Sequence, residues 1–506
     1  MRFIILSYLA ITLFVLPDQI YAMDEAVPTK PSQFRTTFEE VTLPGDEIMG
    51  FQGFTLLYEV NDFIAIGPAA YGALTGNRGG AITLGLATDF GSELTESLSW
   101  NAGVFVGGGG GVGGYTLHGG GLHVRTHLGM DAHLGNWGDV GAGVSYQDFP
   151  TGTVHSFQPY LSYTYNFDTL MVSGWNQEVG EQTAVTESDA SLSEFTVIYR
   201  TYEVPDGVLR DDLKPQFPTV NILGAEWRRF ISEHVYLKVE SEGAMGGQSK
   251  GYMQILFGGG YGFDVTQSTR INASASMGVA GGGHISTAGG LLMDANISVQ
   301  QNLFDGLFLE LGRGYVVAPD GDFKAASLNM YLGYQYEMPD VQGRSINKSA
   351  LAGFEPRHMR LRYVYQQYLK NDPKWRNHHA DLDVGLLGFK CDYFLADNFY
   401  LSGHGVAAVE GQGGNFMIGL IGGGLHQSWG DSPIFADLEF LVGAAGGGGL
   451  DVGGGLAWQG NIELGYQLSE TNQIALSYGE MEATGGNFKA HVVGLSVSYN
   501  LSFFVR

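Results

Sequence analysis

Alternating apolar and polar positions are the clearest pattern along the chain. Near its C-terminal end, small polar residues alternate with apolar ones over residues 494–503. The apolar positions are Leu495, Val497, Tyr499, Leu501 and Phe503. Residues 328–336 repeat the pattern, with leucine, methionine and tyrosine on one face. Alternation with a period of two predicts β-strands that have one apolar face, and stretches with a helical period are scarce.

The last third of the chain divides into eight such segments separated by turn residues. We expect strands near residues 359–369, 383–394, 398–409, 414–428, 434–445, 449–468, 472–482 and 487–503. Eight strands joined by hairpin connections predict an antiparallel up-and-down sheet, and an even number of strands can close into a small barrel.

This organisation occurs three times. We place the copies at residues 34–167, 195–338 and 359–503, with linkers at 168–194 and 339–358. The predicted fold is therefore all-β, with three tandem antiparallel up-and-down eight-stranded β-barrels. One large barrel of about 24 strands is the alternative, because transmembrane barrels of that size exist.

Each copy carries glycine runs at the same place, and their recurrence indicates a geometric purpose. One hypothesis is relief of curvature in a tight barrel, and another is a side-chain-free docking patch for a lipid chain, a flat ligand or a neighbouring barrel. No strand–loop–helix unit with a lysine follows the runs, which argues against phosphate binding. The patch residues are Gly107, Gly108, Gly109, Gly119, Gly120, Gly121, Gly281, Gly282, Gly283, Gly289, Gly290, Gly446, Gly447, Gly448, Gly453, Gly454 and Gly455.

A soluble barrel has its apolar strand faces inside, whereas a membrane-embedded barrel has them outside, toward lipid. The residues on the polar face of the final strand have small side chains, as the interior of a narrow membrane barrel requires. Aromatic residues such as Tyr163 and Phe167 lie near strand ends, as in an interfacial girdle. Residues Lys238, Glu240 and Glu242 share one strand face, where they either pair across a lumen or face solvent. We favour the membrane-embedded barrel.

Composition narrows the location and the partners. The formal net charge of −26 argues against nucleic acid as a partner, because phosphate binding needs clustered basic residues. A single cysteine, Cys391, excludes an intramolecular disulfide framework and suits a bacterial envelope. We expect Cys391 to be a core or barrel-wall residue.

The first 22 residues have the features of a signal peptide, with Arg2, an apolar stretch and a cleavage site after Ala22. The apolar stretch is too short to cross a bilayer as a helix. We therefore predict export and residence in the outer membrane of a Gram-negative cell.

Two segments resemble parts of bacterial outer-membrane β-barrel proteins. The pattern Tyr499-x-Leu501-x-Phe503 is similar to the terminal strand that the assembly machinery of that membrane recognises, although the chain continues to Arg506. The hairpin Phe394–Leu401 resembles a short periplasmic turn of small eight-stranded barrels. The resemblance implies outer-membrane lipid and the assembly machinery as partners, with other barrels as a further option.

Chemical sites are weakly indicated, and we predict no catalytic residue, cofactor or metal. Residues His123 and His127 share a strand face with a metal-like spacing, but the other copies lack them. Residues Ser402 and His404 share a face and form the best candidate for a lipid-modifying enzyme. A lumen hydrogen bond is the more economical interpretation of that pair.

From these patterns we expect a non-enzymatic structural or interaction component of the cell envelope. The alternatives are an outer-membrane channel or transporter and an outer-membrane lipid-modifying enzyme. The transport alternative carries a physical objection, because side chains largely fill the interior of an eight-stranded barrel.

Overall fold

The computed structural model describes residues 26–506 except 176–189, 305, 340–344, 348–350, 352 and 431. Strands dominate, and the short helices α2 (Gly114–His118) and η1 (Gly135–Trp137) lie in connections. Among the described helices, none is sufficiently long and apolar to cross a membrane. The predicted signal peptide, residues 1–22, lies outside the described residues.

The first barrel is a closed antiparallel sheet in which each strand pairs with the next and β9 pairs with β2. Its strands are β2 (Lys30–Leu43), β3 (Glu47–Asn61), β4 (Ile64–Thr75), β5 (Ile82–Thr95), β6 (Leu98–Gly110), β7 (His123–His133), β8 (Asp139–Asp148) and β9 (His155–Thr169).

The second barrel closes in the same way through β18 and β11. Its strands are β11 (Ala190–Glu203), β12 (Thr219–Phe230), β13 (Val235–Gly246), β14 (Met253–Thr266), β15 (Thr269–Gly281), β16 (Leu291–Phe304), β17 (Leu307–Val317) and β18 (Lys324–Pro339).

The third barrel closes through β27, which pairs with both β26 and β20. Its strands are β20 (Glu355–Lys370), β21 (Val384–Ala396), β22 (Phe399–Ala408), β23 (Met417–Ser428), β24 (Ile434–Gly446), β25 (Leu456–Gln467), β26 (Asn472–Ala483) and β27 (Lys489–Val505). The short strand β10 (Val172–Ser173) adds to the edge of β27, and β1 (Ala26–Pro28) pairs with β19 (Ser345–Asn347).

The predicted all-β class with closed, antiparallel, eight-stranded sheets is confirmed. Since β9 returns to β2 and β18 returns to β11, these strands do not continue into one ring of 24. One predicted strand is wrong in its start: residues 449–455 form a loop, and β25 begins at Leu456. Residues Gly449, Gly453 and Gly455 have positive φ angles of 69°, 59° and 102°, which a strand does not accommodate.

Apolar side chains point away from the barrels, toward the surroundings. Phe157 on β9, Ile462 on β25 and Leu476 on β26 are 71%, 64% and 65% exposed. Inward-facing residues of β27, such as Ser498 and Asn500, are at most 1% exposed. This arrangement is typical of a barrel in lipid, because a soluble barrel has its apolar residues inside.

The two ends of the barrels differ. One end, the linker side, carries short turns such as 397–398 together with β1, β10 and β19. The other end, the loop side, carries the longer connections, including α2 and residues 447–455.

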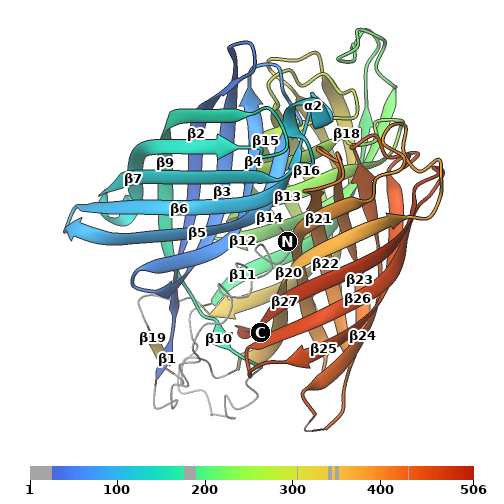
Figure 1. Ribbon diagram of the computed structural model, residues 1–506. Coiled ribbons are helices and arrows are strands. Elements are labelled where there is room, and N and C mark those ends of the chain that lie inside the picture. Colours follow the sequence, from blue (N-terminus) through green and yellow to red (C-terminus); the bar gives the residue numbers. More distant parts are fainter. Residues whose placement is uncertain are drawn as a thin grey trace.

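The three barrels pack side by side around a common centre (Figure 1). The third strand of each barrel lies against the fifth strand of the next: β4 against β15, β13 against β24, and β22 against β6. These contacts close into a ring after three steps. At its centre, Ile82, Ile255 and Met417 from the three barrels belong to one apolar cluster.

Candidate functional site

The interior of the second barrel holds a continuous network of buried ion pairs. The Lys238 Nζ atom lies 2.9 Å from Glu226 and 3.1 Å from Glu240. Glu226 continues the network to Arg228, and Glu240 continues it to Arg200. All five side chains are at most 2% exposed, so the charged face of β13 is a lumen face rather than a solvated one.

Carboxylates outnumber basic groups in this lumen. The buried basic residues are Arg200, Arg228 and Lys238, whereas the buried carboxylates are Glu194, Glu226, Glu240, Glu242, Asp294 and Glu310. Buried charges are stable only when other charges and hydrogen bonds compensate their lost hydration. The three basic groups cannot pair one to one with all six carboxylates in this lumen.

The other two lumens contain related networks. In the third barrel, Arg360 contacts Asp392 and Asp437 at 2.8 Å each, and Lys390 Nζ lies 2.9 Å from Glu463. In the first barrel, Arg125 Nε donates to Glu39 at 2.8 Å. Arg35 pairs with Asp89 in that barrel, and its Nη2 atom lies 3.7 Å from Asp131.

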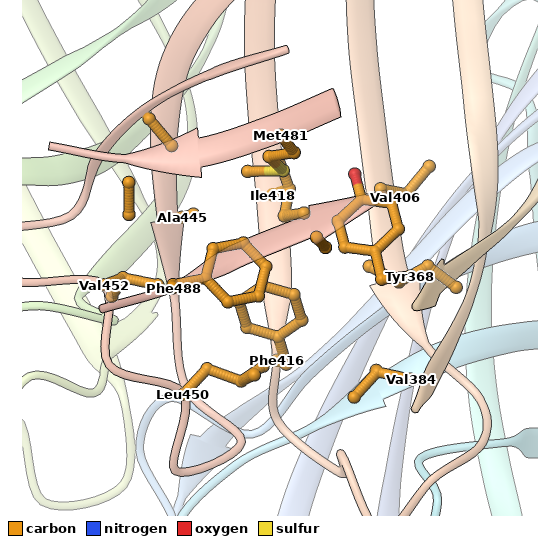
Figure 2. Close-up of a cluster of buried hydrophobic side chains, with 14 of the residues drawn as sticks. Tyr368, Val384, Val406, Phe416, Ile418, Ala445, Leu450, Val452, Met481 and Phe488 are labelled. Carbon is orange, nitrogen blue, oxygen red and sulfur yellow. The ribbon is translucent and has the colours of Figure 1, made fainter. Parts of the chain in front are cut away.

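A cluster of buried hydrophobic side chains, here called the apolar plug, lies at the loop side of the third barrel (Figure 2). Phe416 and Phe488 meet with their ring centroids 5.5 Å apart, and Trp375 stacks on Phe488 at 5.7 Å. These three side chains are fully buried. Equivalent clusters lie in the first barrel, around Phe105 and Phe149, and in the second, around Tyr252 and Phe323. Each lumen thus has a charged stretch and an apolar plug.

The linker side of the third lumen is covered by aromatic residues. Trp175, from the segment after β10, packs against Phe394 at 4.7 Å and against His426 at 5.7 Å. His426 bonds Asp437 at 2.6 Å, which joins this cover to the charged network. The third barrel therefore has packed aromatic side chains at both of its ends.

The predicted enzyme candidate does not form a catalytic pair. Ser402 and His404 both point into the third lumen and are 4% exposed, as their shared strand face predicts. Neither the Ser402 hydroxyl nor either ring nitrogen of His404 has a hydrogen-bond partner in the described part of the chain. A serine nucleophile requires a base within hydrogen-bond reach.

The histidines of the first barrel do not gather into a metal-binding group. His123 is fully buried between Thr83 and Gln147, at 3.0 Å from each. His133 is paired with Asp139 at 2.6 Å on the surface. Among the described residues, no cluster of three or more His, Cys, Asp or Glu residues has a metal-binding arrangement. Cys391 is exposed on the outer wall of β21.

About half of the patch glycines contact a neighbouring barrel. An added Cβ atom at Gly121 would lie 2.2 Å from the Ala408 oxygen, and one at Gly290 would lie 2.3 Å from the Ala73 oxygen. At Gly455 the distance to the Ala244 oxygen would be 2.3 Å. The patch glycines whose added Cβ would closely approach another barrel are Gly108, Gly120, Gly121, Gly281, Gly289, Gly290, Gly446, Gly454 and Gly455.

At the remaining patch glycines, an added Cβ atom would meet only the glycine's own barrel. An added Cβ at Gly109 would lie 2.2 Å from the Ile82 oxygen, and one at Gly283 would lie 2.2 Å from the Ser249 oxygen. The full set is Gly107, Gly109, Gly119, Gly282, Gly283, Gly447, Gly448 and Gly453. Most of the glycines lie at strand ends and in loops, because positive φ angles interrupt the hydrogen-bond ladders of the strands.

Sequence reasoning missed most of the lumen charges. Arg360 and Arg362 alternate with Met359, Leu361 and Tyr363, which places both arginines on the inward face of β20. The same alternation was the signal for Lys238, and it would have located these arginines once the inward face of the strand was assigned.

Comparisons with known proteins agree with this class of fold. No protein-family model matches the chain, and no curated protein matches it. Among solved structures, the siderophore receptor PirA from Acinetobacter baumannii matches with a TM-score of 0.28 and 7% identity, over 94% of this chain and 81% of that one. The outer membrane protein OpdK from Pseudomonas aeruginosa matches with a TM-score of 0.23 and 10% identity, over 94% and 99%.

The ferric enterobactin receptor PfeA from Pseudomonas aeruginosa matches with a TM-score of 0.27 and 8% identity, over 94% and 82%. The resemblance to bacterial outer-membrane β-barrel proteins is thereby confirmed at the level of the β-barrel class. At these TM-scores the likeness extends to the class of fold, and no ligand of these proteins is transferred to this chain.

The predicted role as a structural or interaction component is contradicted. The matching structures are described as siderophore receptors and an outer membrane protein, which agrees better with the transport alternative than with a structural role.

Proposed function

We propose that the protein is an outer-membrane channel for small cations, with its conducting paths inside the barrels. The observation that carries this proposal is the second lumen, where six buried carboxylates face three basic residues. A polar path with excess negative charge lowers the cost of bringing a cation into a low-dielectric barrel. Conduction requires the ion pairs to rearrange around the passing ion.

The small bore limits the expected current. An eight-stranded barrel is just wide enough for its side chains, so the channel opens by small displacements and passes single ions rather than large solutes. In the third barrel, the apolar plug around Phe416 and Phe488 is the barrier on the loop side. A dry apolar constriction of this kind gates channels by excluding water.

Planar-bilayer recordings test this proposal. The wild-type protein is expected to give small, cation-selective steps, identified from the reversal potential in a salt gradient. Phe488→Ala removes part of the plug and is expected to raise the conductance. Phe440→Ala is the matched control, because Phe440 lies in the same barrel but points outward and is 56% exposed. Absence of current in both wild type and Phe488→Ala contradicts the proposal, as do wide, steady, unselective pores.

We also propose that residues 34–167, 195–338 and 359–503 are three tandem, self-contained barrels joined by the linkers 168–194 and 339–358. Export through a signal peptide cleaved after Ala22 is part of the same proposal, with outer-membrane lipid and the assembly machinery as partners. N-terminal sequencing of the protein recovered from membranes tests the cleavage site. Expression of residues 359–506 tests self-containment, since a heat-modifiable, protease-resistant fragment is expected.

A further inference from the structure

We infer that the glycine positions on the loop side form a docking surface that holds the three barrels in a ring even when the linkers between them are cut. The surface fits one kind of partner, a neighbouring barrel of the same repeat. This inference does not depend on the proposed channel activity.

The first support is the cyclic equivalence of the contacts. Gly121 of the first barrel meets Ala408 of the third, Gly290 of the second meets Ala73 of the first, and Gly455 of the third meets Ala244 of the second. Each contact joins the loop before a sixth strand to the end of a third strand. Contacts between different surfaces generate a closed ring when the rotation closes, and here it closes after three barrels.

The second support is that these contacts are between backbones. The φ angles of Gly121, Gly290 and Gly455 are 98°, 108° and 102°, and each glycine faces a backbone oxygen that no rotamer change can move away. A second set of contacts lies nearby. Gly79 N donates to Ala288 O at 2.7 Å, and Asn415 N donates to Gly109 O at 3.2 Å. A lipid chain or a flat ligand has no room where another backbone is seated.

The third support is apolar packing continuous with the glycines inside the membrane. Phe54 of the first barrel stacks on Phe257 of the second with centroids 4.1 Å apart. Leu86 packs with Tyr363 and Leu387 between the first and third barrels. In lipid there is little hydrophobic force between proteins, so association depends on close packing, which small residues permit.

The test cuts the chain after folding. Protease sites are placed in the linkers 168–194 and 339–358, and the cut protein is analysed in mild detergent by native electrophoresis and light scattering. The three fragments are expected to remain one particle. Separation of the wild-type fragments overturns the inference, because the linkers would then be what holds the ring.

The variants target both interfaces of the second barrel. Gly290→Val with Gly455→Val is expected to release the second-barrel fragment about tenfold more than wild type. The matched control is Gly207→Val with Gly485→Val, since those glycines have φ angles of 88° and 82° but open space around a Cβ atom. Equal release from the two double variants overturns the inference.

A second double variant keeps the test decisive if the loop substitutions impair folding. Gly72 and Gly243 point outward from β4 and β13, and an added Cβ would meet Val279 at 2.7 Å and Ala444 at 3.0 Å. Leucine at these positions would suit lipid in a separated barrel, so Gly72→Leu with Gly243→Leu disturbs the interfaces alone. Heat-modifiable fragments that separate after cleavage are expected, and fragments that stay together overturn the inference.

Discussion

Replacing Arg228 by methionine tests whether the lumen network stabilises the second barrel. The guanidinium contacts Glu310 at 2.7 Å, Glu194 at 3.2 Å and Glu226 at 2.5 Å, and its side chain is 2% exposed. Its removal leaves three carboxylates in a low-dielectric interior, with only Lys238 beside Glu226. Breaking a buried ion pair in this way costs about 3–5 kcal/mol.

That free energy is measurable as a shift of the urea midpoint. With a dependence of about 2–3 kcal/mol per molar urea, the midpoint of the second barrel should fall by about 1–2 M. The midpoint is measured by pulse proteolysis of the detergent-folded protein at increasing urea concentrations. The quantity followed is the amount of the second barrel that survives the protease. Adding Glu310→Gln to Arg228→Met removes one uncompensated charge and should recover part of the loss.

The control for this experiment is Arg313→Met. Arg313 pairs with Glu203 on the surface of the same barrel, and both side chains are more than half exposed. An exposed pair contributes at most about 1 kcal/mol. If Arg228→Met shifts the midpoint no more than Arg313→Met does, the lumen is hydrated enough to solvate the carboxylates, and the reasoning from burial is refuted.

Two further predictions concern the loops and the outer wall. Burial lowers the pKa of His118, which lies in the α2 loop, to about 4. The unfolded chain therefore takes up a proton at a higher pH than the folded protein does. The free energy of unfolding is unaffected above pH 6.5 and falls by about 3 kcal/mol as the pH falls toward 4. Between pH 7 and 4.5, the urea midpoint should therefore fall less steeply with pH in His118→Gln than in the wild type. The same pH dependence in both proteins contradicts this prediction. On the outer wall, Ile462 is 64% exposed in the middle of β25, so Ile462→Arg should cost about 2–4 kcal/mol in bilayers, whereas Ile462→Ala costs much less. Equal midpoints for those two variants in lipid vesicles would show that this face does not meet lipid.

Strand positions were predictable because they depend on local alternation. The inward face of β27, with Ser498 and Asn500, follows from its pattern alone. The start of β25 was not predictable in the same way, since glycine suits both a strand and a turn. The φ angles at residues 449–455 are imposed by the loop that packs there.

The alternating sequence pattern could not predict which charged residues pair inside a barrel or which residues meet between barrels. Arg228 finds Glu310 across the barrel, 82 positions away, and the pairing follows from the closure of the sheet. The contact of Gly455 with the Ala244 oxygen leaves no side-chain signature on the alanine, because the contacting atom belongs to the backbone. The recurrence of glycine indicated that another group approaches the backbone closely, but it did not identify that group.

The even number of strands in each barrel has a consequence for how the chain is laid out in the membrane. Because each barrel has eight strands, its first strand begins and its last strand ends on the linker side. A whole barrel is therefore an insertable unit, whose gain or loss leaves the sidedness of every other loop unchanged. The glycine contacts join three such units into a ring, and the even number of strands makes all of them face the same way.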